Sequence, residues 1–166
     1  MKNFGILLFC ALLLTACAST KSGTGDGLSL MEAIEQSAEK TAGELSSGSK
    51  VAVVAFESSN AKLSEFIMEE LNGALKDRGI DIVERSHLKL VMQEQNFQMS
   101  GYVSDETAVS IGKFIGANMV ITGQLSSIGG MYRFRSSAID VEKAVRASIT
   151  RYDLRNDRTL QQMLKQ

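Results

Sequence analysis

Side chains that could carry out catalysis or bind a metal ion are scarce in this sequence. His87 is the only histidine, and no group of His, Cys and carboxylate residues has the spacing of a zinc site. The phosphate-binding and dinucleotide-binding glycine patterns are absent, and so is a nucleophile elbow. His87 stands at the start of a predicted helix, which favours a solvated or cap-side residue; the alternative is a hydrolase that uses it. We therefore expect no catalytic residue, no metal, no cofactor, no small-molecule substrate and no enzymatic activity.

Cys17 is the one residue whose surroundings predict a specific modification. A lysine-containing start is followed by an almost wholly apolar run over residues 4–16 and then by Cys17. This order of charged, apolar and small residues is typical of a secretory signal. The junction Leu14-Thr15-Ala16-Cys17 resembles the lipobox of bacterial lipoproteins, which implies cleavage before Cys17 and lipidation of its thiol. The alternative is an ordinary signal peptide with a cysteine near its end.

The predicted organisation is a lipoprotein signal peptide at 1–16, the lipidated Cys17 and a flexible tether at 17–27, and a single domain at 28–166. The apolar run is about 13 residues, shorter than the roughly 20 that a spanning helix needs, so the membrane partner is reached through the lipid. The small, polar residues 18–27 are typical of a linker and reach about 35 Å when extended. Two or more acyl chains make such an anchor stable.

Location follows from the same segment. In the lipoproteins that this chain resembles, neutral residues directly after the lipidated cysteine, here Ala18 and Ser19, imply sorting to the outer membrane. Cys10 leaves with the signal and Cys17 carries lipid, so no disulfide is expected in the oxidising compartment. We expect an outer membrane lipoprotein of the cell envelope that faces the periplasm.

The charge is unevenly distributed although the formal net charge is only −1. Residues 131–166 carry eight Lys or Arg against four Asp or Glu, whereas residues 18–130 carry nine against fifteen. The basic end is either the solvated face of a hairpin or a surface for an anionic wall polymer, lipid headgroups or an acidic partner. Nucleic acid is not an expected partner, because aromatic residues are not clustered and the compartment is wrong.

Capping residues and hydrophobic periodicity predict an α/β (α+β) fold. It has a mixed sheet of about five strands flanked by helices, with a strand-helix-strand start and an antiparallel meander at the end. The predicted helices are 29–45, the segment from the Asn60 cap to Gly79, 86–97, 104–116 and a short terminal helix around Leu160, Met163 and Leu164. The predicted strands are 50–57, 80–84, 118–128, 131–141 and one through Val145, Ala147 and Ile149.

Two strands have informative patterns. Val51–Phe56 is a continuous apolar run, which predicts a strand covered on both faces of the sheet. In the segment 131–141, Tyr132 and Phe134 share one face, whereas Ile139 and Val141 belong to the other. We expect a bulge near Ser136-Ser137, or an edge strand with one weakly buried half.

Several motifs closely resemble the curli production assembly/transport (CsgG-like) family over about residues 50–145. They are Asp81-Ile82-Val83-Glu84-Arg85, Ser100-Gly101-Tyr102-Val103, Ala108-Val109-Ser110-Ile111-Gly112-Lys113 and Gly116-Ala117-Asn118-Met119-Val120-Ile121-Thr122-Gly123. The peptidoglycan-synthase activator lipoproteins (LpoB-like) resemble this core too. The resemblance implies a non-enzymatic envelope protein with the same core fold.

The chain departs from both relatives. The curli channel, as the family implies, needs inserted membrane hairpins with strands of about 9 to 11 alternating residues, and this sequence has no such insertion. The activators carry a long proline-rich tether, whereas this sequence contains no proline. An autonomous pore is not expected, and the activator role is weakened.

The segment 97–103 is the predicted partner interface. Phe97, Met99 and Tyr102 are of the types that anchor protein partners; the alternative is that they cap the core beneath the loop. The first hypothesis is a lipid-anchored module that binds an envelope protein, or itself as an oligomer, in an export or envelope assembly. The alternative is an activator of a penicillin-binding protein, which regulates peptidoglycan synthesis.

Overall fold

A single mixed sheet organises this computed structural model, which describes residues 27–46, 48–94 and 103–165. The strand order is β2-β1-β3-β4-β5. The strands are β1 (Lys50–Glu57), β2 (Asp81–Ile82), β3 (Met119–Ile128), β4 (Met131–Asp140) and β5 (Val145–Leu154), and the helices are α1 (Leu30–Gly43), α2 (Ala61–Asp77), α3 (Arg85–Glu94), α4 (Asp105–Ile115) and α5 (Arg158–Leu164). β1 pairs in parallel with β2 and β3, and β3, β4 and β5 form an antiparallel meander, so the predicted α+β fold is confirmed.

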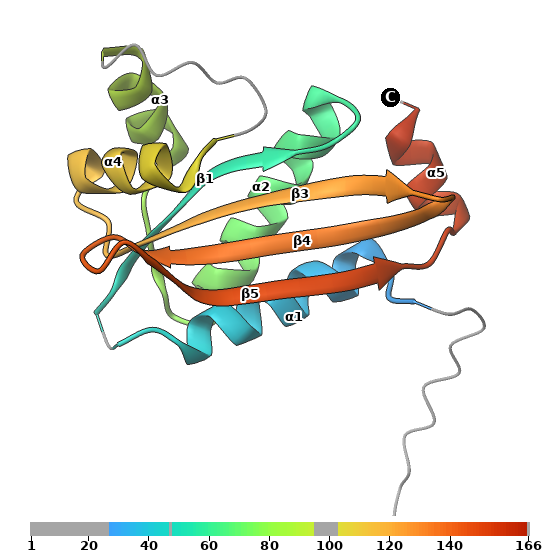
Figure 1. Cartoon of the computed structure of the whole chain (residues 1–166), viewed down its shortest axis with the longest axis horizontal. Helices are drawn as coiled ribbons and strands as arrows, with labels where there is room; N and C mark the ends of the chain where they lie inside the picture. Colours follow the sequence, from blue (N-terminus) through green and yellow to red (C-terminus); the bar gives the residue numbers. More distant parts are fainter. Residues whose placement is uncertain (1–26, 47, 95–102, 166) are drawn as a thin grey trace, which may run out of the picture.

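Helices cover the sheet unequally. In Figure 1, α1 and α2 lie behind the sheet, whereas α3 and α4 lie at one end of it. The core is accordingly divided into two clusters. The first joins the sheet to α1, α2 and α5, and the second joins it to α3 and α4. The second pair of helices therefore leaves part of the sheet uncovered.

The central strand β1 is buried on both faces, as its apolar run predicts. Val51 and Val53 belong to the first cluster, and Ala52 and Val54 belong to the second. Alternate residues of a strand point to opposite faces, so this run supplies both halves of the core. At the middle of the strand the register with β3 shifts between Val53 and Ala55.

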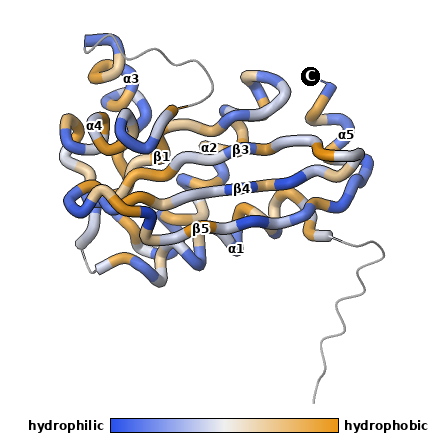
Figure 2. Tube along the Cα trace, in the orientation of Figure 1, coloured by the Kyte–Doolittle hydropathy of each residue, from blue (hydrophilic) through white to orange (hydrophobic). Residues whose placement is uncertain are grey.

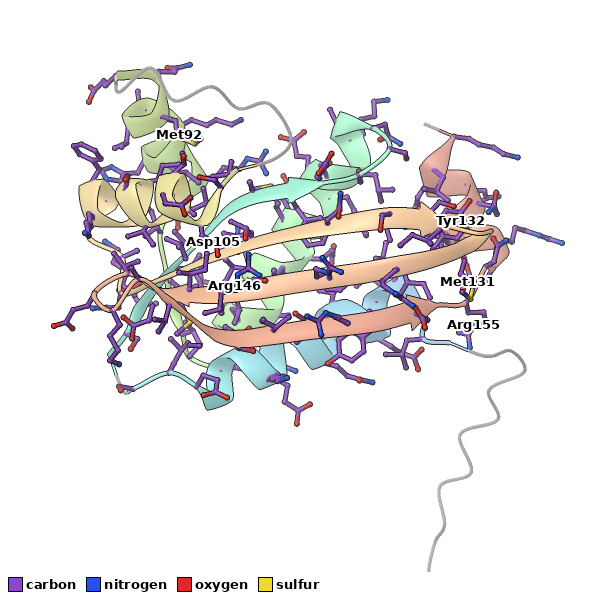
Figure 3. The ribbon with its side chains drawn as sticks, in the orientation of Figure 1. Met92, Asp105, Met131, Tyr132, Arg146 and Arg155 are labelled. Carbon is purple, nitrogen blue, oxygen red and sulfur yellow. The ribbon has the colours of Figure 1, made fainter. Side chains whose placement is uncertain are left out.

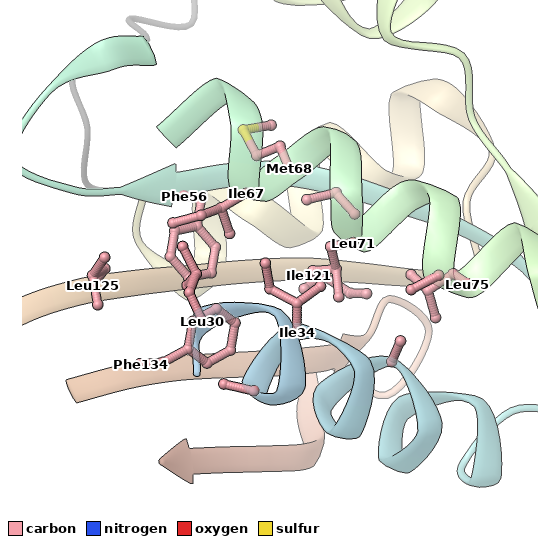
Figure 4. Close-up of a cluster of buried hydrophobic side chains, with 14 of the residues drawn as sticks. Leu30, Ile34, Phe56, Ile67, Met68, Leu71, Leu75, Ile121, Leu125 and Phe134 are labelled. Atoms are coloured by element: carbon pink, nitrogen blue, oxygen red, sulfur yellow. The ribbon is translucent and has the colours of Figure 1, made fainter. Parts of the chain in front are cut away.

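This shift is a bulge that sets the direction of Phe56. With one extra residue in β1, Phe56 faces the same side as Val53, where it lies against Phe134 with ring centroids 5.0 Å apart. Figure 4 shows both rings among the buried side chains near Leu30. Phe56 also pairs with Gly123 across the β1/β3 ladder, and the missing side chain there makes room for the ring.

The predicted caps at the starts of α1 and α2 and the predicted end of α4 are confirmed. Ser29 and Glu32 form the reciprocal capping box of α1, and Asn60 Oδ1 accepts a hydrogen bond from the Leu63 amide at 2.8 Å. Asn60 also donates to the Met163 carbonyl oxygen at 3.2 Å, which attaches α5 to the start of α2. Gly116 ends α4 in the left-handed conformation, with a φ of 66°.

The expected bulge at Ser136-Ser137 is wrong, and so is the edge position. β4 lies between β3 and β5, and its pairing with β3 is unbroken from Met131 to Asp140. Phe134 and Ala138 face the first cluster, whereas Ile139 faces the second. β4 is buried on both faces only where α4 lies over it. A regular strand without a bulge therefore accounts for apolar residues on both of its faces.

Two predicted elements differ in length. The second strand is limited to Asp81–Ile82, because the chain enters α3 at Arg85, directly after Val83 donates a last hydrogen bond to the Val51 carbonyl of β1. α3 ends at Glu94, and the rest of the predicted helix up to residue 97 lies outside the described residues.

We predict that Gly123→Ala destabilises the domain by about 1–3 kcal/mol or more. A β-carbon at this position would lie 2.7 Å from the Arg135 carbonyl oxygen and closer still to the Phe56 ring. Gly73→Ala is the matched control, because Gly73 is exposed in α2 with nothing within 4 Å of an added β-carbon. The control should stabilise by roughly 0.5–1 kcal/mol. Urea unfolding of both variants measures the difference, and equal stabilities would contradict the proposed packing.

Candidate functional site on the open face of the sheet

The residues that the sequence selected as sites are largely outside the described part of the chain. The structure does not describe Cys17, Phe97, Met99 or Tyr102, so the roles of these four residues stay predictions. His87 is exposed on α3. The candidate site consists instead of side chains on β3, β4 and β5.

The uncovered part of the sheet carries a row of polar and charged side chains. Residues that pair directly across antiparallel strands point to the same face, so the register identifies the set. We call it the arginine face: Gln124, Arg133, Arg135, Arg146, Arg151 and Asp153. Figure 2 shows the corresponding hydrophilic stretches along β4 and β5.

Arg135 and Arg151 form the centre of the arginine face. They pair directly across β4 and β5, and both side chains are exposed. Within the described residues, neither guanidinium takes part in an ion pair. Like charges directly opposite each other in a sheet are destabilising, so this arrangement lowers stability unless an anion lies between them.

The other two arginines of the face are neutralised by aspartates. Arg133 Nε donates to Asp153 Oδ1 at 2.7 Å, and this hydrogen bond holds the pKa of Asp153 below its ordinary value. Arg146 binds Asp105 of α4 through two donors, at 2.7 and 3.0 Å. These exposed pairs contribute little stability but fix the direction of both arginines.

A second bulge puts Arg146 on this face. Ala138 pairs with Ser148, whereas Ile139 pairs with Arg146, so Ala147 is an extra residue in β5. Because strand side chains alternate, the extra residue turns Arg146 away from the side of Ser148 and toward α4. Figure 3 shows Arg146 beside Asp105, where the sheet meets α4.

A polar cavity of about 120 Å³ lies between the sheet and the start of α4. Its lining includes Asp105, Thr122, Gln124, Arg135, Ser137 and Arg146. Since one water occupies about 30 Å³ of liquid, this space has the size of a few waters or one carboxylate group. Arg135 borders both the cavity and the exposed centre of the face, so it is placed to bind a carboxylate through its planar donors.

The sequence contained a partial signal for this site. The spacing of Arg133 from Arg135 and of Arg151 from Asp153 is two residues, which puts each pair on one side of its strand. The basic character of the C-terminal segment is visible in the sequence, but the sequence does not assign its charges to a face of the sheet. That assignment needs the register of β4 on β5 and the bulge at Ala147.

Metal sites and membrane-spanning helices are both missing from the described ranges. No three His, Cys, Asp or Glu side chains there come together in a way that could hold a metal ion. No helix of that part of the chain has the length and apolar character needed to cross a bilayer.

Comparison with known proteins gives one family and one fold group. The model of the family described as curli production assembly/transport component CsgG matches residues 28–155. Comparison with curated protein sequences finds no match.

Among solved structures, the LpoB C-terminal domain from Salmonella enterica is similar with a TM-score of 0.65 at 16% identity, covering 76% of this chain and 98% of that chain. The NMR structure of Escherichia coli LpoB is similar with a TM-score of 0.63 at 14% identity, covering 94% and 84%. At these identities the similarity is one of fold.

We predict that Arg151→Glu stabilises the free domain by about 0.2–1 kcal/mol, because it replaces a like-charge pair by an attractive pair with Arg135. High salt should reduce the gain. Thermal and urea unfolding at low and high salt measure both effects. Arg151→Gln removes the repulsion from Arg135 without adding an attraction. It should therefore increase the free energy of unfolding by less than Arg151→Glu does. A loss of stability in both variants would contradict the described geometry.

Proposed function

Because this chain belongs to the curli production assembly/transport component CsgG family, we propose that it is a lipid-anchored envelope protein that binds an acidic protein partner through the arginine face. The partner belongs to an export or envelope assembly. The role is binding, and no catalytic step is assigned to the chain. Cys17 holds the protein on the periplasmic side of the outer membrane.

The observation that carries this proposal is the pair of exposed arginines at the centre of the face. Arg135 and Arg151 lie opposite each other without a carboxylate between them, although aspartates neutralise the arginines on either side. A partner carboxylate would convert this repulsion into two charge-assisted hydrogen bonds. Complementary charge of this kind also speeds association and rejects basic partners.

The surroundings of the pair support a protein partner. Asp153 and Asp105 pair with the neighbouring arginines, which leaves Arg135 and Arg151 as the arginines of this face that can bind a partner carboxylate. The strand backbones beneath are packed on the first core cluster through Phe134 and Leu154. A backbone that is already fixed loses little conformational entropy when it binds.

A second candidate is an activator of a penicillin-binding protein, which would regulate peptidoglycan synthesis. The similarity in fold to LpoB C-terminal domains, which covers 98% of one such domain, favours it. The short tether that the sequence predicts opposes it, because residues 18–27 reach only about 35 Å. The identity of the captured partner separates the two candidates.

We predict that Cys17→Ser moves the protein from the membrane fraction to the soluble periplasmic fraction. Serine cannot accept the thioether-linked lipid, so the anchor is lost. Mass spectrometry of the purified wild-type protein should show a lipid-modified Cys17 at the N-terminus, and fractionation of both strains should show the shift. An unmodified Cys17 in the wild-type protein would contradict the lipoprotein assignment.

We predict that Arg135→Glu with Arg151→Glu lowers partner recovery at least about tenfold, which corresponds to 1.4 kcal/mol of binding free energy. The measurement is affinity capture of the tagged, anchored protein from gently crosslinked envelopes, quantified by mass spectrometry. Arg158→Glu with Lys165→Glu is the matched control, because it makes the same charge change at two exposed residues of the C-terminal region.

The control should retain the partner that the arginine variant loses. Equal recovery with both variants would show that the arginine face is not the interface. Recovery of a penicillin-binding protein would support the second candidate, whereas export or surface components would support the first. Replacing Met99 and Tyr102 by Ser tests the alternative interface, which predicts lost capture with unchanged melting temperature.

A further inference from the structure

The tether enters the domain at a fixed point beside the end of β5. Leu28 donates its amide to the Asp153 carbonyl at 3.0 Å, and the Arg155 amide donates to the Leu28 carbonyl at 2.7 Å. This short parallel bridge pairs Leu28 with Leu154. The chain that leads back toward Cys17 therefore leaves from this end of the sheet.

Gly27 makes that docking possible. A β-carbon there would lie 2.8 Å from the Arg155 nitrogen and 2.9 Å from the Asp153 carbonyl oxygen. Its φ of 122° is also a conformation that other residues rarely adopt. The close approach of the backbone and the positive φ both require glycine at this position. The place where the tether joins the domain is therefore fixed by the fold.

Three of the exposed large apolar side chains of the described residues lie at this end, beside the tether entry, and the other three, Leu90, Phe114 and Val145, lie on α3, α4 and at the start of β5. Met31 lies in the first turn of α1, and Ile128 and Met131 flank the Gly129-Gly130 turn between β3 and β4. Ile128 and Met131 are both 54% exposed. The register places this turn beside the tether entry, because Tyr132 pairs with Leu154 and Leu154 pairs with Leu28. Figure 3 shows Met131, Tyr132 and Arg155 together there.

We propose that this end of the domain faces the bilayer and that Ile128 and Met131 enter the lipid headgroup region. The inference rests on the proposed anchoring through Cys17. A tether that joins the domain beside the hairpin brings this hairpin to the membrane at high effective concentration, so a small apolar contact is sufficient. Two side chains are too few for a stable protein interface, which needs about 1,000 Å² or more.

This orientation determines how a partner meets the protein. In this orientation the strands run roughly perpendicular to the bilayer. The side chains of the arginine face therefore project parallel to the membrane plane. In Figure 1, α3, α4 and the turn between β4 and β5 lie at the opposite end of the sheet, away from the membrane in this arrangement. An acidic partner would therefore approach along the membrane and not from the far side of the periplasm.

The sequence offers a direct test because it contains no tryptophan. Ile128→Trp places a single reporter at the proposed contact, and Val145→Trp is the matched control at the other end of β4 and β5. Val145 is 52% exposed, close to the value for Ile128. Each full, anchored variant is reconstituted in vesicles of brominated phosphatidylcholine, whose bromines quench tryptophan within the bilayer. Vesicles without bromine give the reference intensity.

Quenching severalfold greater for the Ile128→Trp variant than for the control is expected, and adding Met131→Ser to that variant should reduce it. Equal quenching at the two ends would overturn the orientation. Flotation of the vesicles reports anchoring separately. If the protein does not float, the lipid-anchor proposal fails, and the Cys17 thiol is then coupled to a maleimide-bearing lipid so that the two reporters can still be compared.

Discussion

Packing of the Phe56 ring over Gly123 is the contact on which this sheet depends. The ring occupies space that any side chain at position 123 would fill, and it reaches Phe134 on the next strand. The bulge in β1 makes this possible by turning Phe56 toward α1 and α2. Without it, the large ring would face the side of α3 and α4, and the first core cluster would lose the contact between Phe56 of β1 and Phe134 of β4.

A sheet built in this way has one fully covered face and one partly open face. α1 and α2 bury the first face along the strands, whereas α3 and α4 end before the second face is covered. The outer edge of β5 is protected at two points: Leu28 pairs with Leu154, and Lys40 donates to the Ile149 carbonyl at 2.9 Å. Such a charge discourages pairing with another strand, which favours recognition through side chains on the open face.

Most of the helices and strands could be predicted, because their signals are local. Ser29, Asn60 and Ser104 cap helices by accepting hydrogen bonds from backbone amides three positions along the chain. The continuous apolar run of β1 predicts that both faces of this strand are buried. The expected bulge at Ser136-Ser137 shows where this reasoning ends. In this strand Phe134 lies on one face and Ile139 on the other. Such a pattern is explained either by a bulge or by a regular strand that is buried on both faces. Only the position of α4 over the strand shows that the second explanation is right.

The sequence by itself determined the family, the order of the elements and the basic character of the C-terminal segment. Only the tertiary structure decided which of those charges share a surface. Arg135 and Arg151 are far apart in the chain, and they become neighbours through the register of β4 on β5. Arg146 joins them because of one extra residue in β5. Register and bulges arise from the packing of whole strands on helices, and that packing energy is distributed over residues far apart in the chain.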